Sequence, residues 1–481
     1  MQKTALPQTA VAMTGFSGLG LDARLLRALA DLEFTQATPV QAETIPLALA
    51  GRDVLAAAAT GSGKTAAFLL PLMQRLLDTP RGTTRTLVLV PTRELAAQVL
   101  DHFTPLARHT RLRAAAIYGG VGMQPQEQAL RRGVDFVIAT PGRLLDHMQY
   151  DYASLAGIDA LVLDEADRML DMGFLPAIRR ILAALPRTPR QTLFFSATMP
   201  ATIVGLTREL LVKPAQVNVA RPARAATNIT QALYPVPSRL KVELLVELIR
   251  RGTVGNAIVF CRTKHRANRL AQKLEREGVS CARIHGNRSQ AQRTAALAGF
   301  KAGEFRILVA TDIVARGIDI NELDHVVNFD VPAAPDDYIH RIGRTGRADA
   351  TGDAYTLVAP EDEDEVRRIE RALGSRVERR TVDGFDYSAV NEERLEVARH
   401  ERIAAARAAR QPRTRIERPA AAHNGASPRS RSEHGPSPRS RSEQGTTGHG
   451  GALPPRGRSD RDGGGPGSRT RPPRRRGPRA A

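Results

Sequence analysis

The stretch AAAATGSGKT, residues 56–65, follows a short apolar run and precedes a segment with a helical pattern. A phosphate-binding loop has the pattern G-x-x-x-x-G-K-[ST], because backbone N–H groups without bulky side chains must wrap the phosphates. Gly63, Lys64 and Thr65 match this pattern, whereas Ala58 stands in place of the first glycine. A glycine-rich turn that binds no nucleotide is the alternative. The strand before it and the helix after it favour the phosphate loop.

A second stretch, LVLDEADRML at residues 161–170, allows two interpretations. Read alone, it is a buried strand that ends at the surface, with acidic residues that interact favourably with the start of a helix. A phosphate-loop enzyme, however, needs an acid at the end of a neighbouring strand to hold Mg²⁺, and Asp164 follows the apolar run as that requires. Glu165 is one residue further on and can orient and deprotonate a water. Beside the loop at 56–65, the stretch predicts a hydrolytic site.

Short apolar runs alternate with helical patterns through most of the chain. In the segment 264–277, apolar residues recur at spacings of three and four, which predicts a helix. Strands that alternate with helices predict an α/β fold, with parallel sheets covered on both faces. The strands expected are Val54–Ala57, Thr86–Val90, Val134–Ala139, Ala160–Leu163, Thr192–Phe195, Ala257–Phe260, Ser280–Ile284, Ile307–Ala310, His325–Phe329 and Ala354–Val358.

The strand–helix series breaks in the proline-rich segment 213–238, which has no helical period and predicts a connection between two domains. After about Arg399 the apolar pattern gives way to Arg, Ser, Gly and Pro, and SPRSRSE occurs twice, which predicts a disordered tail. The domains expected are an N-terminal extension (1–15), a first domain (16–215), a linker (216–238), a second domain (239–398) and the tail (399–481).

The net charge of +20 is unevenly distributed. Residues 400–481 hold 19 Arg and 6 acidic residues, so this tail carries +13 and the rest of the chain +7. A basic tail on a milder core suggests a polyanionic partner, most often nucleic acid, although a passive, solubilising tail is the alternative. Two cysteines are too few to suggest zinc or disulfides. No signal peptide or membrane span is recognised, so we expect a soluble, cytoplasmic protein.

A series of further motifs resembles the DEAD-box RNA helicases, in the order that this family has. DEADRMLDMGF and HGNRSQAQR resemble most the bacterial RhlE-type subgroup. The matching motifs are TPVQ (38–41), ATGSGKT (59–65), PTRELA (91–96), GG (119–120), TPGR (140–143), DEAD (164–167), SAT (196–198), VFCRT (259–263), HGNRSQAQR (285–293), ATDIVARGID (310–319) and HRIGRTGR (340–347).

The resemblance implies two tandem RecA-like domains, with ATP and Mg²⁺ between them. The amide of Gln41 suits the N6–H₂ and N7 edge of adenine, whereas guanine presents O6 there. Phe16 is expected to stack on the base, with a core position as the alternative. The implied ATP-binding residues are Phe16, Gln41, Ala58, Ala59, Thr60, Gly61, Ser62, Gly63, Lys64, Thr65 and Asp319, with Thr65 and Asp164 as metal ligands.

The resemblance also implies which residues catalyse ATP hydrolysis and couple it to RNA. Arg344 and Arg347 are implied as arginine fingers that stabilise charge on the transferred phosphoryl group, with surface solvation as the alternative. The implied catalytic residues are Lys64, Asp164, Glu165, Arg344 and Arg347. The residues implied to couple hydrolysis to RNA binding are Asp167, Ser196, Thr198 and His340.

RNA contacts implied by the resemblance fall on glycines, hydroxyls and arginines, which suit the sugar–phosphate backbone. Such contacts position RNA without reading its sequence, and the 2′-OH would distinguish RNA from DNA. The residues are Pro91, Thr92, Arg93, Gly120, Thr140, Pro141, Gly142, Arg143, Arg262, Gly286, Gln290, Arg293, Thr311 and Asp312.

The sequence departs from the family pattern at three positions. Family members usually have Gly and Pro where Glu33 and Ala37 stand, and Gln where Ala59 stands, which bears on nucleotide affinity and not on the reaction. Three other functions remain open: a DNA-directed helicase, a non-catalytic RNA-binding or annealing protein, and a factor that docks on ribosomal or RNA-decay assemblies. The intact catalytic residues argue against the non-catalytic protein.

Overall fold

The computed structural model describes residues 15–58, 61–186, 190–219, 228–312, 323–346 and 351–389. Predictions for the tail (399–481) therefore lie outside the described residues. The same holds for four predicted site residues, namely Ala59, Thr60, Asp319 and Arg347.

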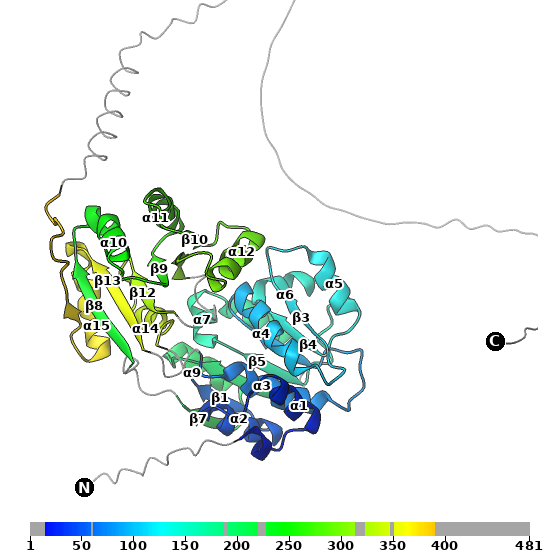
Figure 1. Ribbon diagram of the computed structural model, residues 1–481. Coiled ribbons are helices and arrows are strands. Elements are labelled where there is room, and N and C mark those ends of the chain that lie inside the picture. The colour runs from blue at the N-terminus through cyan, green and yellow to red at the C-terminus, as the bar shows by residue number, and fades with distance from the viewer. Residues whose placement is uncertain are drawn as a thin grey trace, which may run out of the picture. The chain divides into compact units, whose positions relative to one another are not determined.

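The first domain contains a seven-stranded sheet with strand order β3-β4-β2-β5-β6-β1-β7, and every pairing in it is parallel. Figure 1 labels β3, β4, β5, β1 and β7 of this sheet, with helices packed around it. Parallel strands are buried on both faces, and β2, β4 and β5 are buried along their whole length. The strands are β1 (Val54–Ala57), β2 (Thr86–Leu89), β3 (Ala114–Ile117), β4 (Phe136–Ala139), β5 (Ala160–Leu163), β6 (Gln191–Ser196) and β7 (Ala215–Asn218).

The helices of the first domain cover this sheet, and its buried apolar residues form two clusters. They are η1 (Phe16–Leu19), α1 (Ala23–Asp31), α2 (Pro39–Leu49), α3 (Lys64–Leu76), α4 (Arg93–Leu106), α5 (Met123–Arg131), α6 (Pro141–His147), α7 (Ala166–Asp171), α8 (Leu175–Ala183) and α9 (Ala201–Leu210).

The second domain repeats this plan with the strand order β10-β11-β9-β12-β13-β8-β14, again with parallel pairings. Its strands are β8 (Ile229–Pro235), β9 (Ala257–Cys261), β10 (Cys281–Ile284), β11 (Ile307–Thr311), β12 (His325–Asn328), β13 (Gly352–Val358) and β14 (Glu378–Arg379). Its helices are η2 (Ser238–Leu240), α10 (Lys241–Arg250), α11 (Lys264–Arg276), α12 (Gln290–Lys301), α14 (Pro335–Ile342), η3 (Pro360–Asp362) and α15 (Glu363–Leu373).

The prediction of an α/β fold with two tandem parallel-sheet domains is confirmed, and all ten expected strands are present. Four strands were not expected from the sequence: β3, β7, β8 and β14. β3 reads AAAI, and alanine is not enriched in strands. β8 and all but the first residue of β7 lie in the range 216–238 predicted as a linker, so the connection between the two sheets is shorter than this range.

The parallel arrangement brings the carboxyl ends of the strands of each sheet to one edge. The loops that follow β1, β2, β4 and β5 therefore lie at the same edge of the first sheet, and these loops carry the predicted phosphate, acidic and RNA motifs. Within the described ranges, none of the helices has both the length and the apolar character needed to span a lipid bilayer.

Candidate active site

The phosphate loop places Lys64 at the first turn of α3, after β1. Gly63 precedes the helix with φ 93°, a left-handed conformation that glycine adopts without steric cost. The buried Lys64 ammonium donates to the Ala58 carbonyl (3.2 Å) and lies 3.9 Å from Asp164 Oδ1. The loop therefore holds a cation beside the acid at the end of β5.

Gln41 contacts the end of the same loop, at Gly63, where α3 begins. Its Nε2 donates to the Gly63 carbonyl (3.1 Å), while its Oε1 accepts from the Thr38 backbone N–H (2.9 Å). A Cβ atom at position 63 would lie 2.5 Å from Gln41 Nε2 and would require the left-handed φ that glycine adopts most easily, so any other residue there would be strained. The Gln41 amide that was predicted to read adenine thus has protein partners on both of its polar ends.

Asp164 and Glu165 form a buried acidic pair at the end of β5, 2% and 8% exposed respectively. Glu165 has φ 50°, a left-handed conformation that is rare for a residue with a side chain, and its N–H donates to Asp164 Oδ1 (2.9 Å). Burial raises the pKa of Asp164 to about 6; Lys64 opposes this increase and Glu165 adds to it. Lys64 therefore compensates the negative charge of the buried Asp164 only in part.

The donor atoms at this point fit a divalent cation. Carboxylate and hydroxyl oxygens are the ligands that Mg²⁺ prefers, and Asp164, Glu165 and Thr65 all line one cavity. A bound cation would supply the positive charge that the buried Asp164 lacks, which Lys64 at 3.9 Å provides only in part.

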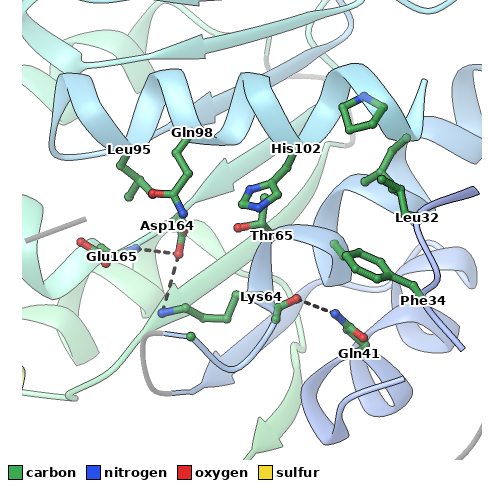
Figure 2. Close-up of a pocket in the computed structure, with 15 residues that line it drawn as sticks. Leu32, Phe34, Gln41, Lys64, Thr65, Leu95, Gln98, His102, Asp164 and Glu165 are labelled. Atoms are coloured by element: carbon green, nitrogen blue, oxygen red, sulfur yellow. Dashed lines mark hydrogen bonds and ion pairs between the residues drawn. The ribbon is translucent and has the colours of Figure 1, made fainter. Parts of the chain in front are cut away.

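This cavity has a volume of about 230 Å³ and extends from the acidic pair to an apolar end (Figure 2). Phe34 borders it from the segment before α2, and His102 borders it from α4. Its lining residues are Leu32, Phe34, Gln41, Gly61, Gly63, Lys64, Thr65, Ala66, Leu95, Gln98, His102, Pro105, Leu106, Asp164 and Glu165. The cavity thus combines a cationic and acidic end with an aromatic end.

The prediction that Phe16 stacks on a nucleotide base is wrong. Phe16 is 4% exposed and belongs to the apolar core of the first domain, where η1 packs against α2. Phe34 is 46% exposed and lines the cavity. Sequence reasoning missed it, although its position seven residues before Gln41 was a usable signal, because a short separation keeps two side chains at one loop.

Asp167 organises the segment that carries Ser196 and Thr198. Its Oδ2 accepts from the N–H of Ala197 (3.1 Å), the N–H of Thr198 (2.8 Å) and the Thr198 hydroxyl (2.9 Å). Ser196 Oγ in turn accepts from the Asp167 N–H (3.3 Å) and donates to the Thr198 carbonyl (2.7 Å). The structure therefore brings together three of the residues predicted to couple hydrolysis to RNA binding.

The fourth of these residues, His340, lies with Arg344 against the phosphate loop. Both line a small cavity with Lys64, Glu165 and Asp167. Arg344 is 3% exposed, so the alternative of surface solvation is excluded for it. Burial lowers the pKa of His340, and the Asp167 carboxylate opposes that decrease. Cationic and imidazole groups of the second domain thus meet the acids of the first.

The predicted RNA residues of the first domain lie together at the carboxyl ends of β2, β3 and β4. Thr92 caps α4 by accepting from the Leu95 N–H (3.2 Å). Gly120 has φ 82°, and a Cβ atom there would lie 1.9 Å from Arg93 Nη1. Arg143 donates to the Val121 carbonyl (3.1 Å), which joins the GG and TPGR motifs. The other members of this group are Pro91, Thr140, Pro141 and Gly142.

The predicted RNA residues of the second domain differ in how far they are exposed and in whether they already have a protein partner. Gly286 has open space around it, and Arg262 has a half-exposed side chain. Asp312, which follows the buried Thr311, accepts from Arg341 (2.6 and 2.8 Å).

Gln290 and Arg293 have a protein partner, although they were predicted to contact RNA. Both are buried, and both bind the Glu94 carboxylate: Gln290 donates at 3.1 Å, and Arg293 lies 2.7 Å away. Glu94 belongs to the PTRELA motif on α4, so these contacts join two of the matched motifs.

Comparisons with known proteins agree with this geometry. Residues 38–205 match the DEAD/DEAH box helicase model, and residues 240–349 match the helicase conserved C-terminal domain. The chain is 41% identical over 383 residues to the DEAD-box ATP-dependent RNA helicase CshA of Bacillus cereus, which covers 80% of this chain and 73% of that protein. CshA of Bacillus subtilis is 40% identical, covering 80% and 77%.

Solved structures show the same fold. The Mss116p structure bound to single-stranded RNA and AMP-PNP has a TM-score of 0.73 and 27% identity, and the match covers 83% of this chain and 87% of that one. Dbp5 of S. cerevisiae, bound to RNA and ADP BeF3, has a TM-score of 0.71 and 29% identity, covering 80% and 99%.

Two parallel-sheet domains, with a phosphate loop and an acidic pair on the first and a buried arginine of the second beside them, define a RecA-like ATPase of the helicase type. The family models and the 41% identity place it more narrowly. The chain belongs to the DEAD-box ATP-dependent RNA helicases.

Proposed function

We propose that this protein hydrolyses ATP when RNA is bound and uses the cycle to separate short RNA duplexes locally. The observation that carries this proposal is the cavity shared by Lys64 and Glu165 of the first domain and His340 and Arg344 of the second. A site completed by residues of both domains is active only when they are together, so ATP and RNA that each favour this state help each other to bind.

The roles within the site follow from chemistry. Lys64 binds the phosphates, and Glu165 orients the attacking water. Thr65 and Asp164 would hold a Mg²⁺ ion, which would supply further positive charge at the phosphates. Arg344 neutralises charge that develops on the transferred phosphoryl group, together with Arg347. Asp167, Ser196, Thr198 and His340 would couple this site to RNA binding; Asp167 contacts Ser196 and Thr198, and its charge acts on His340.

The adenine base would lie at the apolar end of the cavity, against Phe34 and near Gln41. Replacing Phe34 by alanine is expected to raise the KM for ATP about tenfold with little change in kcat, because stacking on an aromatic ring is worth about 1–3 kcal/mol per base. Steady-state ATPase assays measure this. Val212→Ala removes another exposed apolar side chain, outside the cavity, and should leave KM unchanged. An unchanged KM for Phe34→Ala would contradict the assignment.

RNA would cross the carboxyl edges of both sheets and contact the protein through its sugar–phosphate backbone. Glycines, hydroxyls and arginines at this edge supply N–H groups, short donors and planar cations, which bind without reading bases. Separating stacked pairs costs on the order of 1.4 kcal/mol per step, so one closure can open a few pairs. The activity is therefore local and non-processive.

The arginine-rich tail would add sequence-independent affinity for RNA. A chain truncated after Arg399 loses 13 net positive charges, so its RNA affinity should depend less steeply on salt than that of the full chain. Titrations of both proteins with one RNA at several salt concentrations measure the two slopes. Equal slopes would mean that the tail does not tether RNA.

The most direct test of the proposed function compares ATP hydrolysis without nucleic acid, with single-stranded RNA and with DNA of the same sequence. We expect stimulation by RNA and little by DNA, because 2′-hydroxyl contacts distinguish the two. Equal stimulation by DNA would favour a DNA-directed helicase. No stimulation by either would favour a non-catalytic scaffold.

We also propose that this protein belongs to one subgroup of the family. DEADRMLDMGF and HGNRSQAQR support the RhlE-type subgroup, although the relatives at 40–41% identity carry the name CshA. A cytoplasmic protein of this kind, without zinc, would act in ribosome assembly or RNA decay. Crosslinking the protein to cellular RNA and sequencing the bound RNA would identify its targets; an absence of ribosomal and decaying RNA among them would exclude both roles.

A further inference from the structure

Two tyrosines after α6 form a stacked pair that the proposed helicase site does not use. The rings of Tyr150 and Tyr152 are nearly parallel, with an angle of 8° and centroids 5.4 Å apart. The Arg131 guanidinium, at the end of α5, lies 4.6 Å from the centroid of the Tyr152 ring. We name these three residues the Tyr150 stack.

Within the stack, Tyr152 and Arg131 are held in place by contacts with neighbouring residues. The Tyr152 hydroxyl lies 3.0 Å from His147 Nδ1, and the His147 ring meets the Tyr152 ring edge-on at 5.8 Å. Glu127 accepts from Arg131 at 2.8 Å, which fixes the guanidinium over the ring. Because Tyr152 is held from several directions, it offers Tyr150 a fixed surface, and the Tyr150 ring is oriented before any ligand arrives.

Tyr150 itself remains open to solvent, with 54% of its surface exposed. Among the described residues, only four large apolar side chains are exposed: Phe34, Val121, Tyr150 and Val212. The whole chain has only seven tyrosines and no tryptophan. An exposed, oriented aromatic ring is thus rare in this protein, and Phe34 already lines the nucleotide cavity.

The position of the stack relates it to the predicted RNA path. It joins the end of α5, which follows the GG motif, to the segment after α6, the helix that begins within the TPGR motif. At the start of these helices, Arg143 of α6 donates to the carbonyl of Val121, just before α5. The TPGR motif forms the start of α6, and the helix rises about 6 Å from Arg143 to His147 at its end. Tyr150 follows His147 three residues later, so a short stretch of chain connects the motif to the stack.

The charges around the stack favour a stacking ligand over a phosphate. Arg131 is paired with Glu127, and Arg143 lies 3.5 Å from Asp146. The nearby cations are therefore largely neutralised by carboxylates, whereas the open aromatic ring is not covered. Every nucleobase has a π-face, and base–aromatic stacking tolerates any sequence.

We propose that Tyr150 stacks on an unpaired base of RNA that continues beyond the GG and TPGR motifs. This inference rests on the proposed RNA path across the first domain. It adds to the backbone contacts one contact that requires a base but not a particular base. The contact would hold a single strand after separation, because a base within a duplex cannot stack on a protein ring.

The absence of tryptophan makes a direct test possible. Tyr150→Trp introduces the single tryptophan of the full-length protein, and its emission reports on stacking at this position. We expect oligo(U) long enough to pass the TPGR motif to quench this emission. Short oligo(U) that fills only the motif sites should not, nor should long RNA with abasic residues at the nucleotides that reach the stack. Val212→Trp is the matched control, since it is 75% exposed elsewhere on the first domain; its emission should be unaffected by all three.

Affinity measurements complete the test. Tyr150→Ala should weaken binding of the long oligo(U) roughly fivefold or more, from about 1–3 kcal/mol of stacking, and leave binding of the short one unchanged. Tyr150→Phe should bind as the native protein does. The proposal is overturned if Tyr150→Ala binds both RNAs normally, if the emission of Tyr150→Trp is quenched equally by abasic RNA, or if long oligo(U) does not quench it. RNA-stimulated ATP hydrolysis of the native protein, measured in parallel, shows whether a failure concerns this contact or the proposed function itself.

Discussion

Replacing Lys64 by alanine is expected to reduce ATP hydrolysis by about 10²–10³-fold or more, while RNA binding stays largely intact. The ammonium lies among Ala58, Asp164 and the phosphate loop, where it would contact the transferred phosphate, and removing one such electrostatic contact typically has an effect of this size. Single-turnover hydrolysis measures the chemical step, and RNA titration without nucleotide measures binding.

Two further variants make the result interpretable. Lys64→Ala leaves Asp164 buried without its nearest cation, which lowers stability, so thermal unfolding must accompany the assay. Glu165→Gln keeps the shape of the side chain and should also abolish hydrolysis, without removing that ion pair. Lys301→Ala, an exposed lysine at the end of α12, should hydrolyse ATP as the native protein does. Normal turnover in Lys64→Ala would refute the site.

The second large effect is expected for Arg344→Ala. An arginine that neutralises the transferred phosphoryl group contributes about 10³–10⁵ in kcat in related phosphoryl transfers. Arg344 is buried against Lys64 and Glu165 but would act on the transition state, so kcat should fall while affinity for ADP changes little. RNA-stimulated kcat and ADP binding, measured on the same variant, separate the two quantities.

Conservative and distant substitutions test the assignment of Arg344 further. Arg344→Lys should recover little activity, because an ammonium is a point charge and cannot bind phosphate through a planar fork. Arg276→Ala, on the exposed side of α11, serves as the control. A variant Arg344→Ala that lost ADP affinity and kept its kcat would mean that this arginine binds the ground state only.

The sequence predicted the elements whose pattern is local. The run before residue 58 and the glycines after it define a strand, a tight turn and a helix within a few residues, and the structure places Gly63 at φ 93° as that turn requires. Asp164 and Glu165 were found for the same reason, since the apolar run before them marks a buried strand. The strand β8, in contrast, lies in a proline-rich segment and forms because β13 and β14 pair with it.

Contacts between distant segments could not be predicted in this way. Phe16 and Phe34 are both aromatic residues upstream of Gln41, and only packing buries the first in the core and leaves the second in the cavity. Gln290 and Arg293 are residue types that suit contacts with RNA, yet their partner in the structure is Glu94, about 200 residues earlier in the chain. The Tyr150 stack depends likewise on α5 and α6 ending side by side.

By itself, the sequence determined that this chain forms two parallel-sheet domains, with a phosphate loop, an acidic pair and a basic tail. These features depend on residues close together in the chain, whose spacing fixes strands, turns and helix starts. The tertiary structure alone decided which aromatic ring faces the nucleotide cavity, which charged groups are buried against one another, and which stacked ring remains exposed. The reason is physical: exposure and the choice of partner depend on which distant surfaces pack together, and the spacing of residues in one segment carries no information about the other.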